Sequence, residues 1–378
     1  MKSSAKLAAG REVRRKSGAA GAPVIAVMLV FVGLLIDIKS SWGQQWKDVL
    51  AKGKEEGQVV LGTSLGIPSL RQNVVNAFAK RFDIKVELRV LGTPELNAAA
   101  ARECTAGRPS MDVLLSGNSE LLSLYPKGCL APVRPRLLFP ETANPEHWRD
   151  GRLKFNDPEN QYLFQTAEHV LGWVIINRER IKPQDIKVAR DLLKPEFKEK
   201  MVSYDPRRGG SGQSDAAYLL TLFGEEFIQN LYVDQKIAYT SDHRQQADWV
   251  ARGVHWIGLG SVERVFEPMR KEGLPIGVIS FQDVAYLAGG SSVLKLVKDA
   301  PHPNAATVLL NWLASREGQE IYSRSVLQPS RRTDVNVKGI PEYLSVKPGV
   351  KYVDSYDHEF YAKKRPEAIK ALIKLLGR

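Results

Sequence analysis

The sequence predicts a mixed α/β protein that folds as two lobes. Short apolar stretches alternate with stretches whose apolar residues recur at helical spacing, from Trp46 onward, which is typical of parallel sheets covered by helices on both faces. A proline-rich passage without clear periodicity, residues 132–158, separates two such series. Roughly 335 residues would remain after removal of a leader, more than one hydrophobic core usually serves. We therefore expect two βα sheets with a ligand cleft between them.

In the first series, polar residues follow each expected strand. The strands are expected at residues 59–63, 86–91 and 111–115, and the helices at 46–56, 69–82, 96–106 and 120–125. Ligands gather beyond the carboxyl ends of parallel strands, and four residues there are candidate ligand contacts: Ser64, Thr93, Ser116 and Asn118. Helix capping alone would account for most such serines and threonines, and the two roles are compatible.

The second series opens with an almost continuous apolar strand at residues 170–177, of the kind that is buried on both faces. Further strands are expected at 202–204, 236–240 and 255–259, with a helix at 244–251. The chain is expected to cross back to the first lobe near residues 276–280. A strand at 292–297 and a helix at 303–322 then follow.

A glycine-rich turn, residues 204–215, lies between a strand and a helix of the second series. Its glycines would let a ligand approach the backbone, and the first amides of the helix present partial positive charge. Two arginines add bidentate donors. The candidate contacts here are Arg207, Arg208, Gly210, Ser211 and Gly212, with Ser241 at the start of the next helix. The alternative is an ordinary surface loop that only begins a helix.

The first 43 residues have the features of a secretory signal peptide. Six basic residues precede the apolar run 24–36, and small residues follow at 41–43. The run is shorter than the ~20 residues that span a bilayer, although a retained, tilted anchor is the alternative. Cleavage would place the protein in the periplasm. It would also lower the formal charge from +12 to +7, because seven basic and two acidic residues are lost. Without a basic stripe, this charge does not indicate nucleic-acid binding.

Two cysteines, Cys104 and Cys129, are the only ones in the chain. In an oxidising compartment they are a candidate disulfide. Closing the loop of about 26 residues between them would stabilise the fold by about 3 kcal/mol. The alternative is a pair of separate buried thiols.

Three motifs resemble one protein family. They are a late segment made of residues 299–306 (DAPHPNAA) and 310–319 (LNWLASREGQ), the turn 204–214, and residues 244–253 (RQQADWVARG). All three are similar to segments of extracellular solute-binding proteins of bacterial ABC importers, in the ferric-iron-type subgroup. The likeness runs from about residue 46 to 334. It implies a type II two-lobed periplasmic-binding fold, ligand capture by hinge closure, and an inner-membrane permease as partner.

From this resemblance and the periodicity we expect residues 44–168 with 275–300 to form lobe 1, and residues 169–274 with 301–335 to form lobe 2. Residues 336–378 would be a C-terminal extension. Its last helix has one apolar face, which we expect to pack on a lobe. A docking element for the permease is the alternative.

The chain departs from iron-binding members of the family, which carry adjacent tyrosines as metal ligands. The comparable stretch, residues 256–263, contains none. Ferric iron prefers grouped anionic oxygen ligands, and His255 with Glu263 would be a poor substitute. We therefore expect no metal and no cofactor, with iron held by non-standard ligands as the alternative.

Several helix N-termini with one or two arginines would suit a small anionic solute. Trp173, Trp256 and Tyr286 could add an aromatic wall that favours an organic acid, although core packing is the alternative for each. We expect a monomer that binds this solute and is not an enzyme.

One motif argues for catalysis. Ser292 and Lys295 have the Ser-x-x-Lys spacing of penicillin-recognising acyl enzymes, but that chemistry needs a helix, and residues 292–297 alternate like a strand. A periplasmic ligand sensor shares every other feature with a transport protein.

Overall fold

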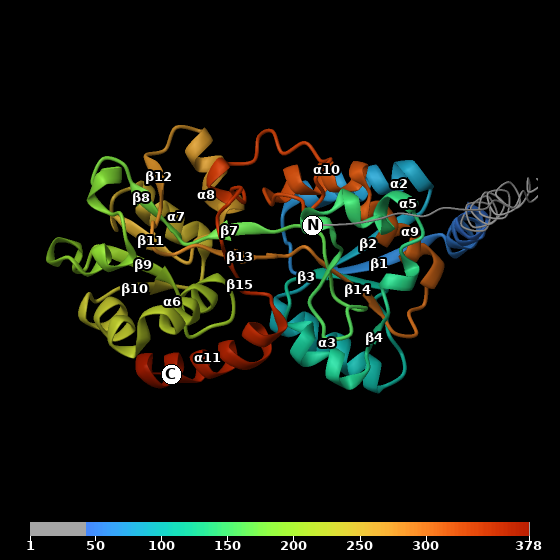
Figure 1. The fold of residues 1–378 in the computed structure, drawn as a ribbon, viewed down its shortest axis with the longest axis horizontal. Helices are drawn as coiled ribbons and strands as arrows, with labels where there is room; N and C mark the ends of the chain where they lie inside the picture. Colours follow the sequence, from blue (N-terminus) through green and yellow to red (C-terminus); the bar gives the residue numbers. More distant parts are fainter. Residues whose placement is uncertain (1–42, 378) are drawn as a thin grey trace, which may run out of the picture. The chain divides into compact units, whose positions relative to one another are not determined.

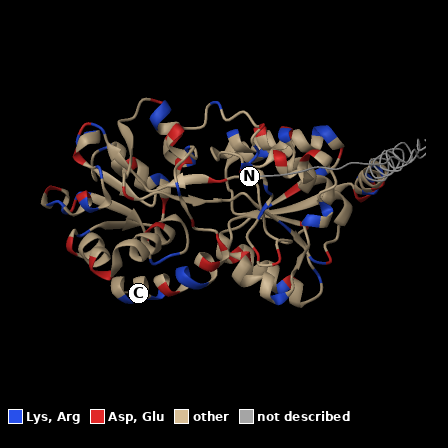
Figure 2. Cartoon of the chain, in the orientation of Figure 1, with Lys and Arg blue, Asp and Glu red and all other residues tan. Residues whose placement is uncertain are grey.

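The computed structural model describes residues 43–377, of which 46–377 belong to one compact unit (Figure 1). The proposed leader lies outside the described residues, apart from Gly43, which is helical together with residues 44–56. Within the described part of the chain, no helix combines the length and the apolar character needed to cross a membrane. Figure 2 shows acidic and basic residues interspersed along the ribbons of both lobes.

The first sheet has seven strands in the order β2-β1-β3-β14-β6-β5, with β4 also paired to β14. The strand β1 is parallel to both β2 and β3, as a βαβ series requires, whereas β14 is antiparallel to β3. The strands are β1 (Gln58–Thr63), β2 (Lys85–Val90), β3 (Val113–Ser116), β4 (Leu130–Ala131), β5 (Lys154–Phe155), β6 (Phe164–Gln165) and β14 (Val293–Val297).

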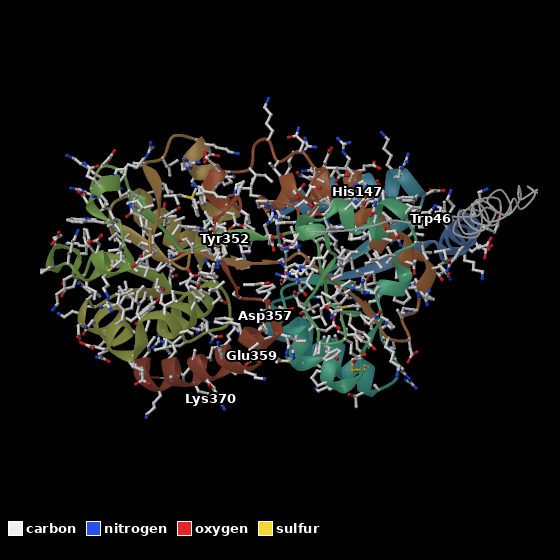
Figure 3. The ribbon with its side chains drawn as sticks, viewed as in Figure 1. Trp46, His147, Tyr352, Asp357, Glu359 and Lys370 are labelled. Atoms are coloured by element: carbon white, nitrogen blue, oxygen red, sulfur yellow. A yellow bond between two sulfur atoms is a disulfide. The ribbon has the colours of Figure 1, made fainter. Side chains whose placement is uncertain are left out.

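Helices pack against this sheet through a large aromatic and aliphatic core. The core includes Phe78, Trp148 and Trp312, each no more than 1% exposed. The helices are α2 (Asn76–Phe82), α3 (Thr93–Thr105), α4 (Glu120–Ser123), α5 (Pro140–Ala143), α9 (Pro303–Ala314) and α10 (Arg316–Val326), and a π-helical turn (Leu70–Val75) precedes α2. The structure bonds Cys104, at the end of α3, to Cys129, with their Cα atoms 5.7 Å apart (Figure 3).

The second sheet has five strands in the order β10-β9-β11-β8-β12. The parallel strands are β9 (Met201–Tyr204), β10 (Ala238–Thr240) and β11 (Ile257–Leu259), and the antiparallel ones are β8 (Trp173–Asn177) and β12 (Ile276–Ser280). The helices are α6 (Ser211–Ile228), α7 (His243–Ala251) and α8 (Glu263–Lys271), with a π-helical turn (Gln229–Asp234) after α6.

Three short strands connect the lobes: β7 (His169–Leu171), β13 (Tyr286–Ala288) and β15 (Val353–Asp354) (Figure 1). The strand β13 is antiparallel to β7 and parallel to β15. The continuous strand expected at 170–177 is therefore interrupted. The break falls at Gly172, whose φ is +104° and where a Cβ atom would lie 2.1 Å from the Val284 carbonyl oxygen.

Two of the expected lobe boundaries are wrong. The strand β12, which we placed in lobe 1, pairs with β8 in the second sheet. The helices α9 and α10, which we placed in lobe 2, bury Trp312 and Val326 in the core of the first sheet. Both assignments depend on pairings between segments far apart in the sequence, which local periodicity does not reveal.

The C-terminal extension contacts both lobes. It contains a π-helical turn (Phe360–Lys364) and α11 (Arg365–Leu376), which packs against α6. Leu372 of α11 is fully buried in the core of the second lobe, while Tyr361 joins a cluster of the first lobe. In Figure 3, Asp357 and Glu359 lie at the junction of the lobes.

Candidate functional site

The carboxyl ends of the strands in both sheets approach the same connecting segment, residues 286–290. On the second lobe, the Tyr286 hydroxyl of β13 donates to Asp215 in the first turns of α6. On the first lobe, a Cβ at Gly117, just after β3, would lie 3.3 Å from the Tyr356 hydroxyl oxygen. That hydroxyl donates to the Gly290 carbonyl oxygen at 2.9 Å. The candidate residues at the ends of β3 and β9 therefore lie near one hinge.

Ser116 is not available to a ligand, contrary to our expectation. Its hydroxyl donates to Glu120 Oε1 at 2.7 Å and accepts from Lys295 Nζ at 2.6 Å. Lys295 and Glu120 form a fully buried ion pair at 3.1 Å. Burial lowers the pKa of Lys295, and the Glu120 carboxylate opposes that shift. Ser116 thus completes a structural network, since buried charges need hydrogen-bond partners.

The other three candidates of the first lobe keep free polar atoms. Asn118 is 1% exposed, and its Oδ1 accepts from Asn156 Nδ2 at 3.1 Å, but its Nδ2 has no partner among the described residues. Ser64 and Thr93 are half-buried, and neither hydroxyl makes a hydrogen bond within residues 43–377. These groups remain candidates.

The glycine-rich turn begins α6 as expected, but its side chains are largely occupied by one another. Arg207 donates from Nε and Nη2 to Asp205, at 2.9 Å each, and its guanidinium lies over the Tyr239 ring. Burial raises the pKa of Asp205, and hydrogen bonds from Arg207 more than offset this, so the pKa is lowered overall. Arg208 is 67% exposed, and its Nε atom lies 3.9 Å from Asp205 Oδ2, which is too far for a hydrogen bond. Arg208 is therefore the less constrained cation of the two.

The glycines of this turn have a packing role. A Cβ at Gly212 would lie 2.0 Å from the Tyr204 carbonyl oxygen, and a Cβ at Gly260 would lie 2.6 Å from the Gly212 Cα. The hydroxyl of Ser211 donates to the Gly260 carbonyl oxygen at 2.6 Å and caps no amide. The first turn of α6 is thus pressed against the turn that follows β11, which explains the glycines without a ligand.

Three further candidates lie elsewhere or inside the core. Ser241 is exposed, and Asp242 caps α7 in its place, accepting from the Arg244 amide at 2.8 Å. Trp256 precedes β11, at the amino end of the strand, where it lies against Lys200, so its assignment to the ligand side was wrong. Tyr286 is 2% exposed and stacks on Tyr218 with ring centroids 3.9 Å apart, as its core-packing alternative requires.

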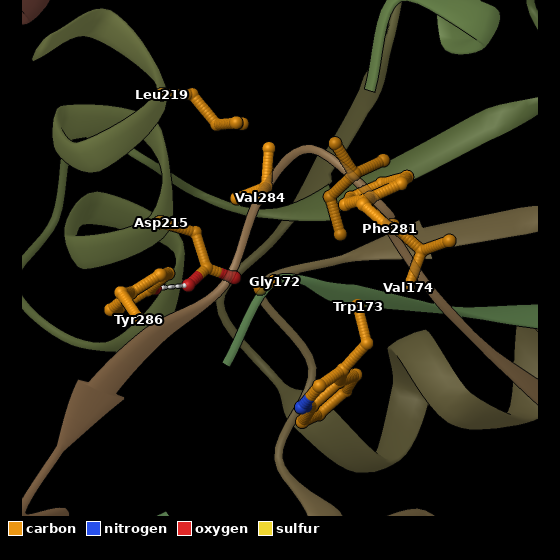
Figure 4. A pocket seen from close by; sticks show the side chains of 10 residues that line it. Gly172, Trp173, Val174, Asp215, Leu219, Phe281, Val284 and Tyr286 are labelled. Carbon is orange, nitrogen blue, oxygen red and sulfur yellow. Dashed lines mark hydrogen bonds between the residues drawn. The ribbon is translucent and has the colours of Figure 1, made fainter. Parts of the chain in front are cut away.

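A small cavity lies behind Tyr286 in the second lobe (Figure 4). Its volume is about 20 Å³, and its lining includes Trp173, Asp215, Phe281 and Tyr286. This volume suits about one water molecule and no solute. Burial raises the pKa of Asp215 to about 6. A larger groove of about 680 Å³ on the first lobe, beside Trp46 and Trp312, contains none of the candidate residues.

The acyl-enzyme motif separates into two unrelated roles. The Ser292 hydroxyl donates to the Gly289 and Ala167 carbonyl oxygens. Lys295 lies on β14 and directs its ammonium to Ser116, Gly117 and Glu120.

The structure adds two residues in the first turn of α8: Arg264, which the sequence reasoning passed over, and Glu263, which it considered only as a substitute iron ligand. Glu263 is 3% exposed, yet neither oxygen has a hydrogen-bond partner in the described part of the chain. Arg264 is half-buried and makes no hydrogen bond, ion pair or ring contact within residues 43–377. The two follow the carboxyl end of β11. Ligands bind beyond the carboxyl ends of parallel strands, and this criterion, which selected Ser116 and Ser211, also selects Glu263 and Arg264.

Two histidines complete this group, which we call the α8 cluster: His169, His243, Glu263 and Arg264. His169 is 4% exposed and His243 is half-buried, and the Nδ1 atom of each lacks a partner among the described residues. Burial and the Arg264 charge together lower the pKa of His243 to about 4. Burial also lowers the pKa of His169, where the Glu263 charge opposes the shift and the Arg264 charge adds to it. At neutral pH the imidazoles are therefore uncharged, and Arg264 is the cation of the cluster.

The α8 cluster belongs mainly to the second lobe and lies near Tyr322 of the first. His169 lies on the connecting strand β7, and the other three belong to the second lobe. Tyr322, on α10 of the first lobe, lies close enough that the charges of Glu263 and Arg264 both affect its pKa, which burial raises. Within residues 43–377, no three His, Cys, Asp or Glu side chains are grouped as metal ligands would be. His255 and Glu263, the substitute iron ligands considered above, lie at opposite ends of β11.

This chain belongs to the bacterial extracellular solute-binding protein family, whose sequence pattern it matches over residues 67–325. A Haemophilus influenzae protein without assigned function is 24% identical over 265 residues, covering 67% of this chain and 71% of the relative.

Solved structures share the two-lobed fold. The periplasmic binding protein AfuA from Actinobacillus pleuropneumoniae, with fructose-6-phosphate bound, superimposes with a TM-score of 0.63 at 20% identity, covering 85% of this chain and 98% of that one. A ferric binding protein from Campylobacter jejuni gives a TM-score of 0.66 at 18% identity, covering 85% and 100%. The Trichodesmium protein IdiA (FutA), in complex with iron and citrate, gives 0.62 at 20% identity, covering 84% and 99%.

Proposed function

We propose that this protein is the periplasmic substrate-binding component of an ABC importer and that it captures a small organic anion between its two lobes. Arg264 carries the proposal. A half-buried guanidinium with no protein partner in the described residues has five donors to satisfy. A carboxylate or a phosphate group is the ligand that satisfies such donors in pairs.

The surroundings of Arg264 support an anion over iron. Ferric iron requires several anionic oxygen ligands together, whereas the α8 cluster offers one carboxylate and two neutral imidazoles. Proteins of the same fold have been solved with a sugar phosphate and with iron plus citrate. The fold therefore accommodates both classes, and the side chains of this chain favour the organic anion.

Capture would follow from hinge closure. The lobes are joined by β7, β13 and β15. When the lobes approach, a solute bound to Arg264 would gain contacts from the first lobe. The polar atoms that remain free there belong to Ser64, Thr93 and Asn118. Because the solute would touch both lobes only in the closed form, its differential affinity would shift the balance toward closure. The closed form is the one that we expect an inner-membrane permease to recognise.

Mass spectrometry of the small molecules that co-purify with the native protein tests this function. An organic acid or a sugar phosphate, confirmed by a thermal shift when it is added back to stripped protein, is the expected result. A neutral solute, or tightly bound iron with no organic anion, would contradict the proposal.

A further inference from the structure

We infer that the solute carries a hydrogen-bond donor, a hydroxyl or an ammonium group, next to its acid group. This inference rests on the proposed function and adds a second requirement to it. The acid group would bind Arg264, and the donor would bind the neighbouring Glu263 carboxylate.

Glu263 differs from the other most deeply buried carboxylates in the described part of the chain, each of which has partners. Asp112 accepts from the Val60 and His302 amides, Glu120 accepts from Ser116 and Lys295, Glu168 pairs with Arg149 and Arg331, and Glu267 accepts from Tyr343 and Arg270. Glu263, 3% exposed, has no hydrogen bond or ion pair within residues 43–377, not even with the adjacent Arg264. A hydrogen-bond donor on a bound solute would give Glu263 the partner that the other buried carboxylates already have.

The energetics point in the same direction. A buried carboxylate without partners is strongly disfavoured, and such groups are normally paired or hydrogen-bonded. The position of Glu263 at the N-terminus of α8 stabilises its charge only weakly, too little to replace a donor. Glu263 in this state is therefore suited to accept a hydrogen bond from a ligand.

The two residues together define the chemistry of the ligand. Arg264 donates and the Glu263 carboxylate accepts, and the charges of both act on His169 and Tyr322. One small molecule with an acid group and a nearby donor would therefore satisfy both. The unpartnered Nδ1 atoms of His169 and His243 can each bond a further hydroxyl. Hydroxy acids, amino acids and phosphorylated polyols fit this description, whereas an alkyl carboxylate or a fully ionised alkyl phosphate would leave Glu263 unpaired.

Matched pairs of probes test the inference by isothermal titration calorimetry on the full chain, stripped of endogenous solute. Gluconate is compared with hexanoate, glutamate with glutarate, and fructose 6-phosphate with butyl phosphate at about pH 8.5, where an alkyl phosphate has lost both protons. In each pair only the first compound has the donor, and the three pairs distinguish hydroxyl from ammonium and carboxylate from phosphate. We expect at least one donor-bearing compound to bind at least tenfold more tightly than its partner, because a site that hydrogen-bonds a ligand group rejects the analogue lacking it.

A pair of glutamate variants then assigns the preference to Glu263. Glu263→Gln should reduce the preference within the binding pair at least tenfold. Glu267→Gln, one turn later on α8, is the matched control, because its carboxylate is already bonded to Tyr343 and Arg270, and it should keep the preference. The preference of the unmodified protein tests the inference even if a variant fails to fold.

The possible outcomes separate this inference from the proposed function. Equal binding within every pair that binds, or an unchanged preference in folded Glu263→Gln, would overturn the donor requirement and leave the anion-binding function intact. If no acid of either kind binds and the co-purified solute is neutral, the proposed function fails and this inference fails with it.

Discussion

The ammonium of Lys295 lies 3.1 Å from a carboxylate oxygen of Glu120, and both side chains are fully buried. They join β14, which returns to the first lobe after the hinge, to the polar turn after β3. Lys295→Met should therefore lower the free energy of unfolding by about 3 to 5 kcal/mol, because it leaves a buried carboxylate without its cation. Urea denaturation measures this loss.

The double variant Lys295→Met with Glu120→Gln should recover much of that loss, since it removes the unpaired charge as well. Equal instability of the single and double variants would show that packing, and not the ion pair, determines the effect.

Asp215 should make stability depend on pH. Burial raises its pKa from 3.8 to about 6, so the folded state holds its proton more tightly than the unfolded chain. The free energy of unfolding should then fall as the pH rises from about 4 to about 6, by up to about 3 kcal/mol. Asp215→Asn should remove this component, so its stability should fall less than that of the unmodified protein. Urea unfolding at pH 4, 5, 6 and 7 compares the two, and parallel profiles would contradict the assignment.

The disulfide between Cys104 and Cys129 closes a loop with a sequence separation of 25 residues. The double variant Cys104→Ser with Cys129→Ser should lose about 3 kcal/mol of stability, through the greater freedom of the unfolded chain. The unmodified protein measured in a strong reductant should match the variant. A reductant without effect would show that the bond contributes little or stays protected.

The glycine-rich turn remains a proposed part of the solute site. Replacing both Arg207 and Arg208 with alanine should weaken anion binding at least tenfold, because it removes two cations and exposes the Asp205 carboxylate that Arg207 now pairs. Lys370→Ala is the control, since Lys370 is exposed on α11 (Figure 3) and should not affect affinity. Unchanged affinity in a folded double variant would leave the turn with a packing role only.

Periodicity was sufficient to predict the α/β class, most strands of both sheets and the position of α6. It failed where distant segments decide the outcome. The hydroxyl of Ser116 is taken by Lys295, 179 residues further along the chain, and β12 joins the second sheet through β8. No local pattern carries either fact. By contrast, Arg264 follows the end of β11 and could have been selected from the sequence, but the stretch that we compared with the iron ligands ended at residue 263.

The substitution Arg264→Gln tests the central claim most directly. With the co-purified anion as ligand, isothermal titration should show at least a tenfold loss of affinity, because a charge-assisted contact worth about 1.5 to 3 kcal/mol is removed. Arg270→Gln, on the same helix but already bonded to Glu267, should bind like the unmodified protein. If folded Arg264→Gln binds the anion as tightly as the unmodified protein does, Arg264 does not hold the solute and the account is contradicted.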